Sequence, residues 1–168
     1  RTFFTEELPA FITNVFPVSK KREDTFIAGF SMGGYGAWYL ALSTPTLYAK
    51  SASMSGALDI AALYEQAMNG SVDSPFPWDD IYEDPKKLAG SDKDLFELYS
   101  GCQKNGLVPE LYQTCGTEDF LYDLNVSVKN RMEQMNASLV YREGPGGHNW
   151  DFWDVEIRDI LDWMLKGR

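Results

Sequence analysis

Ser31 lies in the pentapeptide GFSMG, in which a glycine stands two positions away from the serine on each side. In a strand-turn-helix elbow this spacing permits a strained turn that holds the serine hydroxyl above a sheet, where it can attack a carbonyl carbon. The amide of Met32 would begin the following helix and donate to the oxyanion that forms. The pattern predicts a nucleophilic serine. A glycine-rich turn with a capping serine is the alternative, and a phosphate loop is disfavoured because no lysine follows the glycines.

His148 is the base that such a serine would need, because it is the only histidine among the 168 residues. It follows a predicted strand, Ser138 to Glu143, and a glycine-rich loop, Gly144 to Gly147. In open α/β sheets, ligand chemistry collects beyond the carboxyl ends of the strands. We therefore expect His148 at the same sheet edge as the serine. An ordinary surface or core histidine is the alternative.

A carboxylate should orient the imidazole, and in this class of fold it lies between the serine and the histidine along the chain. The segment Leu111 to Cys115 predicts a short strand, which the turn GTED and a helix follow. Asp119 is the favoured acid. Glu118 is the alternative, because the two neighbouring side chains point in opposite directions and the geometry of the turn does not choose between them. A further interpretation lets Asp119 only cap the turn before the helix. The chain order Ser31, Asp119, His148, each after its own strand, favours catalysis.

The elements that must position these residues alternate between strands and helices. Strands are expected at about residues 25–30, 49–54, 110–115 and 138–142. Helices are expected from Arg1 to Phe16, directly after Ser31, and at about 59–68, 92–100, 123–135 and 151–166. In the first helix, Thr5 is a candidate N-cap and Pro9 lies near the first turn. The alternation predicts an α/β fold with a mostly parallel sheet flanked by helices.

Three segments carry a resemblance to a known family: GFSMGGYGAW around Ser31, CGTEDFLYDLN around Asp119 and GGHNWDFW around His148. They resemble the α/β-hydrolase esterases of the esterase D type, which include S-formylglutathione hydrolases, feruloyl and acetylxylan esterases and, most similar here, bacterial tributyrin esterases. The resemblance runs from the first residues to the last helix. It implies an α/β-hydrolase fold with Ser31 as nucleophile, Asp119 as acid, His148 as base and Met32 as one oxyanion amide.

The early position of Ser31 departs from that family, in which the serine elbow follows the fifth strand of an eight-stranded sheet. There is no room before Ser31 for the earlier strands. We therefore expect residues 1–168 to be the C-terminal part of a single α/β-hydrolase domain, with the N-terminal strands missing and an open edge on the strand at 25–30. The second oxyanion donor would lie outside this chain. The expected partner is an N-terminal segment of the same enzyme, with a homo-oligomer also open.

The segment at about residues 59–109 is too long for a simple crossover between two strands. It is expected to be an insertion. Long insertions in such folds often cover an active site, so Phe76 and Trp78 are candidate substrate-binding residues. The alternative, that these aromatic side chains only fix the insertion to the body of the domain, is favoured.

The composition excludes several classes of partner. The net charge of −10 argues against nucleic acid, and no segment approaches twenty consecutive apolar residues, which argues against a membrane span. Cys102 and Cys115 lack the spacing of a metal or redox motif, so two free thiols in a reducing cytoplasm are expected. No metal or cofactor is expected.

These observations predict a serine esterase that hydrolyses short-chain carboxylic esters through a Ser-His-Asp triad and an acyl-enzyme. A small-molecule ester is the expected substrate. Carbohydrate-acyl esters with feruloyl or acetyl groups, and S-formylglutathione, are alternative substrates. An acyltransferase, a related peptidase and a non-catalytic binding fragment are less favoured alternatives.

Overall fold

A computed structural model describes residues 2–72 and 76–166 of the chain. Within these residues one parallel sheet forms in the order β1-β2-β3-β4. Its strands are β1 (Phe26–Phe30), β2 (Lys50–Met54), β3 (Glu110–Gly116) and β4 (Leu139–Gly144). The expected strands and the α/β class are confirmed. Because all four strands are parallel, their carboxyl ends meet at one edge of the sheet.

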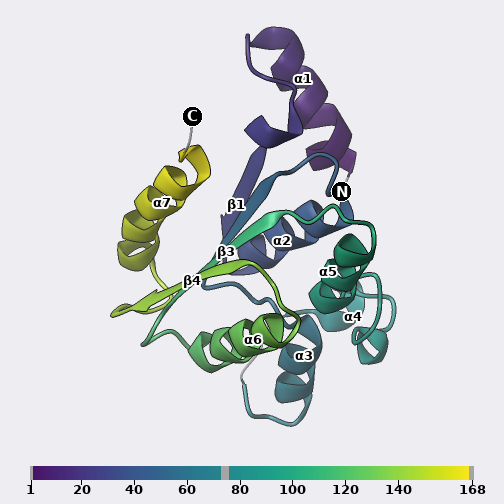
Figure 1. Cartoon of the computed structure of the whole chain (residues 1–168). Coiled ribbons are helices and arrows are strands. Elements are labelled where there is room, and N and C mark those ends of the chain that lie inside the picture. The colour runs from purple at the N-terminus through teal and green to yellow at the C-terminus, as the bar shows by residue number, and fades with distance from the viewer. Residues whose placement is uncertain (1, 73–75, 167–168) are drawn as a thin grey trace.

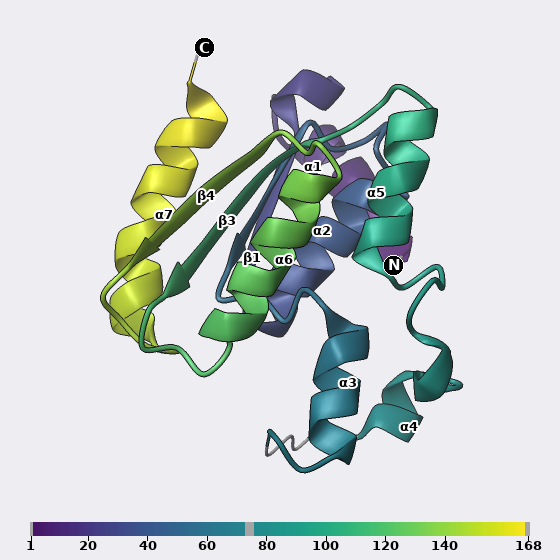
Figure 2. The same cartoon turned by 60° about the horizontal axis from the view of Figure 1, so that its bottom comes forward.

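The remaining described elements are helical. They are η1 (Phe3–Glu7), α1 (Leu8–Val15), η2 (Arg22–Asp24), α2 (Met32–Ser43), α3 (Ile60–Met68), α4 (Trp78–Ile81), η3 (Pro85–Lys87), α5 (Leu95–Lys104), α6 (Tyr122–Gln134) and α7 (Trp150–Leu165). Figure 1 shows the sheet in the middle of the molecule, and Figure 2 shows α7 on one face with α2 and α6 on the other. The result is a three-layer α/β architecture, as the sequence predicts.

The two faces of the sheet bury different sets of side chains. On one face, Phe152, Ile160 and Met164 of α7 pack against Ala52 and Tyr112 of the central strands. Their helical spacing explains why this stretch forms an amphipathic helix. On the opposite face, α2 and α6 enclose a larger core around Trp38, which is completely buried. Central strands covered on both faces bury nearly every residue, as β2 and β3 do.

The strand β1 forms the edge of the sheet. Its only strand partner within residues 2–72 and 76–166 is β2, with Phe26 opposite Lys50. The open edge that the sequence predicts is confirmed. Beside it, a groove of about 690 Å³ is lined by α1 and β1, and Phe11 and Val15 of α1 are 60% and 55% exposed.

The N-terminal helical segment differs in detail from its prediction. It begins with a π-helical turn, η1, and continues as α1, in which Pro9 occupies one of the first two positions. Thr5 lies inside η1, so the prediction that it caps the helix is wrong; the first described turn begins before it. Arg1 lies outside the described residues. Across the described ranges, no helix is both long and apolar enough to cross a membrane.

Residues 59–109 contain the helices α3, α4, η3 and α5 between β2 and β3. Asp59 and Asp94 cap α3 and α5 through their carboxylates, which accept backbone N–H groups. Trp78 is buried and packs against the rings of Tyr64 and Tyr82. The aromatic side chains of this segment therefore belong to the same hydrophobic core as those of α2.

Candidate active site

Ser31 occupies the turn between β1 and α2 with φ 54° and ψ −126°. A positive φ is costly for a residue with a side chain, and it persists only where the surroundings hold it. Here the Ser31 N–H donates to the Met54 carbonyl at 2.9 Å, and its own carbonyl accepts from Gly34 at 3.0 Å. The backbone is thus fixed from both sides. The strand, strained turn and helix that the pentapeptide predicts are all present.

The glycines around Ser31 differ in what they make possible. A Cβ atom at Gly29 would lie 2.1 Å from the Gly33 carbonyl oxygen, so no larger residue fits there without a backbone shift. At Gly33 itself a Cβ atom would meet no described atom within 4 Å. The second crowded position is Gly34, where a Cβ atom would lie 2.4 Å from Ser53 Oγ and 3.0 Å from Gly56 Cα.

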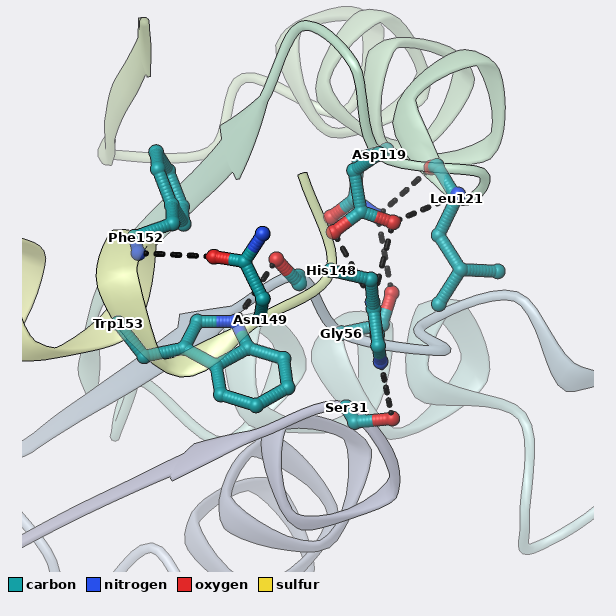
Figure 3. A network of polar contacts seen from close by, with 10 residues as sticks. Ser31, Gly56, Asp119, Leu121, His148, Asn149, Phe152 and Trp153 are labelled. Carbon is teal, nitrogen blue, oxygen red and sulfur yellow. Dashed lines mark hydrogen bonds and ion pairs between the residues drawn. The ribbon is translucent and has the colours of Figure 1, made fainter. Parts of the chain in front are cut away.

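His148 lies between Ser31 and Asp119 (Figure 3). Its Nε2 atom is 2.9 Å from Ser31 Oγ. Its Nδ1 atom is 3.0 Å from Asp119 Oδ1 and 2.9 Å from Oδ2. With Nδ1 protonated and donating to the carboxylate, Nε2 is free to accept the serine proton. The structure thus brings together the three residues that the sequence places after three different strands.

Asp119 is buried, whereas the alternative acid Glu118 is exposed. Burial raises the pKa of Asp119, but hydrogen bonds from His148, Ser55 and the Leu121 N–H outweigh it and hold the pKa below its ordinary value. The Leu121 N–H lies 2.8 Å from Oδ1. Asp119 therefore caps the turn before α6 and contacts the imidazole at the same time. The cap that the alternative interpretation predicts is present, but it is not the only contact of this carboxylate.

The loops that carry Asp119 and His148 are joined by backbone hydrogen bonds. Thr117 N–H donates to the Gly144 carbonyl at 2.8 Å, and Glu118 N–H donates to the Gly146 carbonyl at 3.0 Å. A Cβ atom at Gly116 would lie 2.1 Å from that same Gly146 oxygen. Because the loops extend the pairing of β3 and β4, the spacing between carboxylate and imidazole is set by main-chain contacts rather than by flexible side chains.

Aromatic rings surround the imidazole of His148. Phe120 lies at a centroid distance of 4.6 Å and is 68% exposed, while Trp153 meets the imidazole edge-on at 5.0 Å. Trp153 also stacks on Phe30 at 4.4 Å. These rings fix the imidazole plane and leave Nε2 directed at Ser31. The sequence did not single out Phe120, although it follows the predicted acid directly.

A pocket of about 540 Å³ adjoins Ser31. Its lining is mainly apolar and includes Phe30, Met32, Met54, Trp150, Trp153 and Ile157. Phe76 and Trp78 are not among its described lining residues; Trp78 packs in the insertion instead, as the favoured alternative holds. A contact of either residue with substrate stays a prediction.

Met32 begins α2 directly after Ser31, so its N–H belongs to the first helical turn, where amides have no acceptor within the helix. The positive end of the helix dipole adds to its suitability for a developing oxyanion.

In the described ranges, no group of three or more His, Cys, Asp or Glu side chains is arranged to hold a metal ion. Cys102 and Cys115 are both buried free thiols.

A family model described as "Putative esterase" matches residues 1–164. An acetyl esterase from Caldicellulosiruptor saccharolyticus is 36% identical, over 98% of this chain and 63% of its own length. The chain therefore spans less than two thirds of that curated relative.

Solved structures also match nearly all of this chain over only part of their own length. The S-formylglutathione hydrolase FrmB of Staphylococcus aureus superimposes with a TM-score of 0.80 at 30% identity, covering 94% of this chain and 61% of that one. The fluorophosphonate-binding serine hydrolase FphF of the same organism gives 0.77 at 29% identity, with 96% and 62% covered. A ferulic acid esterase gives 0.75 at 24% identity, with 97% and 59% covered, and shows the fold alone.

Proposed function

This chain belongs to the esterase family whose model matches residues 1–164, and we propose that it carries the catalytic triad of a serine esterase acting on short-chain carboxylic esters. The observation that carries the proposal is the continuous set of hydrogen bonds from Ser31 through His148 to Asp119. An ordinary surface histidine would not lie within 3.0 Å of both a strained serine and a buried carboxylate.

In the proposed reaction, His148 Nε2 takes the Ser31 proton as Oγ attacks the ester carbonyl carbon. The Met32 N–H donates to the resulting oxyanion. Asp119 holds the Nδ1–H and stabilises the imidazolium. His148 then returns the proton to the alcohol oxygen as the C–O bond breaks, which leaves an acyl group on Ser31. Water, deprotonated by His148, then attacks the acyl carbon. The bond from the acyl carbon to Oγ breaks, His148 returns the proton to Oγ, and the carboxylic acid leaves.

Replacement of Ser31 tests this mechanism. We expect Ser31→Ala in the intact protein to lower the hydrolysis of p-nitrophenyl acetate by several orders of magnitude without loss of folding. Ser127→Ala is the matched control, because Ser127 is an exposed residue of α6. Esterase activity retained by Ser31→Ala, or lost equally in Ser127→Ala, would contradict the role of Ser31.

The substrate is proposed by similarity. The similarity to an acetyl esterase supports substrates with short acyl groups. The prediction of a tributyrin-esterase-like enzyme also implies substrates with short acyl groups. Feruloyl or acetyl esters of carbohydrates and S-formylglutathione are the alternative substrates, since relatives with those names share the fold. A panel of p-nitrophenyl acetate, tributyrin, methyl ferulate, acetylated xylan and S-formylglutathione, compared by kcat/KM, distinguishes them.

We also propose that a segment outside these 168 residues adds to the sheet at β1 and supplies the second oxyanion donor. The open edge of β1, the groove beside α1 and the smaller length of this chain relative to the acetyl esterase support this. Esterase activity of the 168-residue chain should then be far below that of a longer form that includes the additional segment. Equal activity of the two forms would contradict the proposal.

Two buried free thiols also support the expectation of a reducing compartment such as the cytoplasm. Fractionation of cells followed by immunodetection of the protein tests this directly. Recovery outside the cytoplasm would contradict it.

A further inference from the structure

Asn125 is a completely buried polar residue of α6 that the mechanism above does not use. Burying an amide is costly unless its N–H groups and its oxygen find partners. Its Nδ2 atom donates to the Gly56 carbonyl at 3.0 Å and to the Leu121 carbonyl at 2.9 Å. Gly56 lies in the turn after β2 and Leu121 in the turn after β3, and Figure 3 shows both beside the triad. One buried side chain therefore joins two turns at the carboxyl edge of the sheet.

The orientation of this amide is fixed by Gln113, which is also completely buried. Gln113 Nε2 donates to the backbone carbonyl of Asn125 at 2.9 Å, and a carbonyl can only accept. The same Nε2 lies 2.9 Å from Asn125 Oδ1 and donates its second proton there. Asn125 Nδ2 is then left to face the two turn carbonyls. The amide cannot rotate without losing the hydrogen bonds of both its nitrogen and its oxygen.

Each of the two turns leads to a member of the proposed triad. In the turn after β2, the N–H of Ala57 donates to the Ser31 carbonyl at 3.3 Å. In the turn after β3, the N–H of Leu121 donates to Asp119 Oδ1 at 2.8 Å. Asn125 thus lies between the backbone that contacts the nucleophile and the backbone that contacts the acid.

The distance between Ser31 and Asp119 matters because one imidazole has to reach both. His148 Nε2 is 2.9 Å from Ser31 Oγ, and its Nδ1 is 2.9 Å from Asp119 Oδ2. The ring is rigid, so a larger separation of the hydroxyl and the carboxylate lengthens at least one of these hydrogen bonds. A misplacement of about 1 Å in a catalytic group can lower a rate by about 10²-fold. The position of the two turns relative to each other therefore bears directly on proton transfer.

We propose that Asn125 is a positioning residue that sets the distance between the Ser31 elbow and the Asp119 turn. The inference rests on the proposed esterase function, in which one imidazole serves both residues. Asn125 does not contact the reacting atoms and acts through the two carbonyls that accept from its amide. Backbone hydrogen bonds between the loops after β3 and β4 set the distance from acid to base. Asn125 adds the distance from acid to nucleophile.

The variant Asn125→Ser breaks the link between the turns while keeping the local contact. A serine in a helix can donate to the carbonyl four residues earlier, here that of Leu121, but its side chain is too short to reach Gly56 as well. We expect kcat for p-nitrophenyl acetate in the intact protein to fall about tenfold, with KM within about twofold of wild type. The reason is that proton transfer depends on the distance between the turns, whereas the apolar pocket beside the nucleophile keeps its lining.

Val128→Ala is the matched control. Val128 is buried in the same helix, and its side chain has no polar group that could bond to either turn. Its truncation loosens the packing of α6 but should leave kcat at the wild-type value. A second readout comes from the one histidine of the chain. Asn125→Ser should shift or broaden the downfield Nδ1 proton resonance of His148, and Val128→Ala should leave it in place.

Two further variants separate positioning from a general loss of structure. In an Asp119→Asn background, Asn125→Ser should change kcat by less than about twofold, because the distance to an acid that no longer acts has little effect. Gln113→Met keeps a side chain of similar size but removes the donor that orients Asn125, so it should lower kcat about threefold.

Wild-type kcat in folded Asn125→Ser, an equal loss in Val128→Ala, or a tenfold loss that persists in the Asp119→Asn background would overturn this role. If Asn125→Ser does not fold, Gln113→Met decides, and wild-type kcat in that variant overturns the role as well.

Ser31→Ala in the same assay keeps these outcomes distinct from a failure of the proposed function. Activity retained by Ser31→Ala contradicts the esterase mechanism itself, whereas activity lost there and kept in Asn125→Ser overturns only the role of Asn125.

Discussion

The carboxyl edge of the sheet and the side edge formed by β1 are built to different degrees by this chain. At the carboxyl edge, Ser31, Asp119 and His148 are held by hydrogen bonds whose donors and acceptors all come from residues of the chain. At the side edge, β1 has one strand neighbour among the residues that the structure describes, and α1 leaves apolar side chains in contact with solvent. The difference indicates that this chain by itself arranges the proposed nucleophile, base and acid, whereas it leaves the outer side of β1 without a strand neighbour among the described residues.

Among the predicted effects, replacement of Asp119, the proposed acid, should have the largest, and it concerns kcat. We expect Asp119→Asn to lower kcat by about 10³- to 10⁴-fold, because the amide cannot stabilise the imidazolium and favours the wrong imidazole tautomer. Steady-state hydrolysis of p-nitrophenyl acetate measures this. Glu118→Gln is the matched control, since Glu118 is exposed, and it should keep nearly full activity. The reverse ranking would assign the acid to Glu118.

The elbow glycines offer the next largest effect, on stability. Gly29→Ala should lower the free energy of unfolding by about 3 kcal/mol or more, because its Cβ atom would overlap the Gly33 carbonyl. Gly33→Ala has open space and lies in a helix, so it should raise stability by about 0.5 kcal/mol. Urea denaturation of both variants of the 168-residue chain gives the comparison. Equal losses would show that the elbow is not limited by this contact.

Hydrogen exchange compares the edge strand β1 with the central strand β3. In the 168-residue chain we expect amides of β1 to exchange about 10²-fold faster than those of β3, because one side of β1 lacks a strand partner in the described structure. In a longer form whose additional segment pairs with β1, this difference should disappear. Equal protection of β1 and β3 in the shorter chain would mean that its edge is already covered, for example by a second copy.

The smallest expected effect concerns acid stability. Burial works to raise the pKa of Asp119, but its hydrogen bonds leave it lower in the folded state than the ordinary value of 3.8. The carboxylate therefore contributes stability that is fully present above the unfolded-state pKa and is lost as the pH falls through the lower folded-state pKa. The gap in unfolding free energy between wild type and Asp119→Asn should narrow below about pH 4. Urea denaturation at several pH values checks this, and a constant gap would contradict it.

Much of the fold follows from the sequence because local patterns determine it. Apolar runs, glycine turns and the presence of one histidine predict the four strands and the order Ser31, Asp119, His148. The prediction of Thr5 as a cap failed because the π-helical turn begins before it, which no cap pattern reveals.

The choice between Glu118 and Asp119 could not be settled from the sequence. Glu118 and Asp119 are neighbours, and only the turn geometry buries one and exposes the other.

Covalent labelling with a fluorophosphonate is the most direct test of Ser31 as a nucleophile activated by His148. Peptide mass spectrometry of the intact protein should find the phosphonyl adduct on Ser31, with fluoride displaced and no adduct in Ser31→Ala. His148→Ala should label at least about 10²-fold more slowly. An adduct on another residue, or undiminished labelling of His148→Ala, would contradict the central claim.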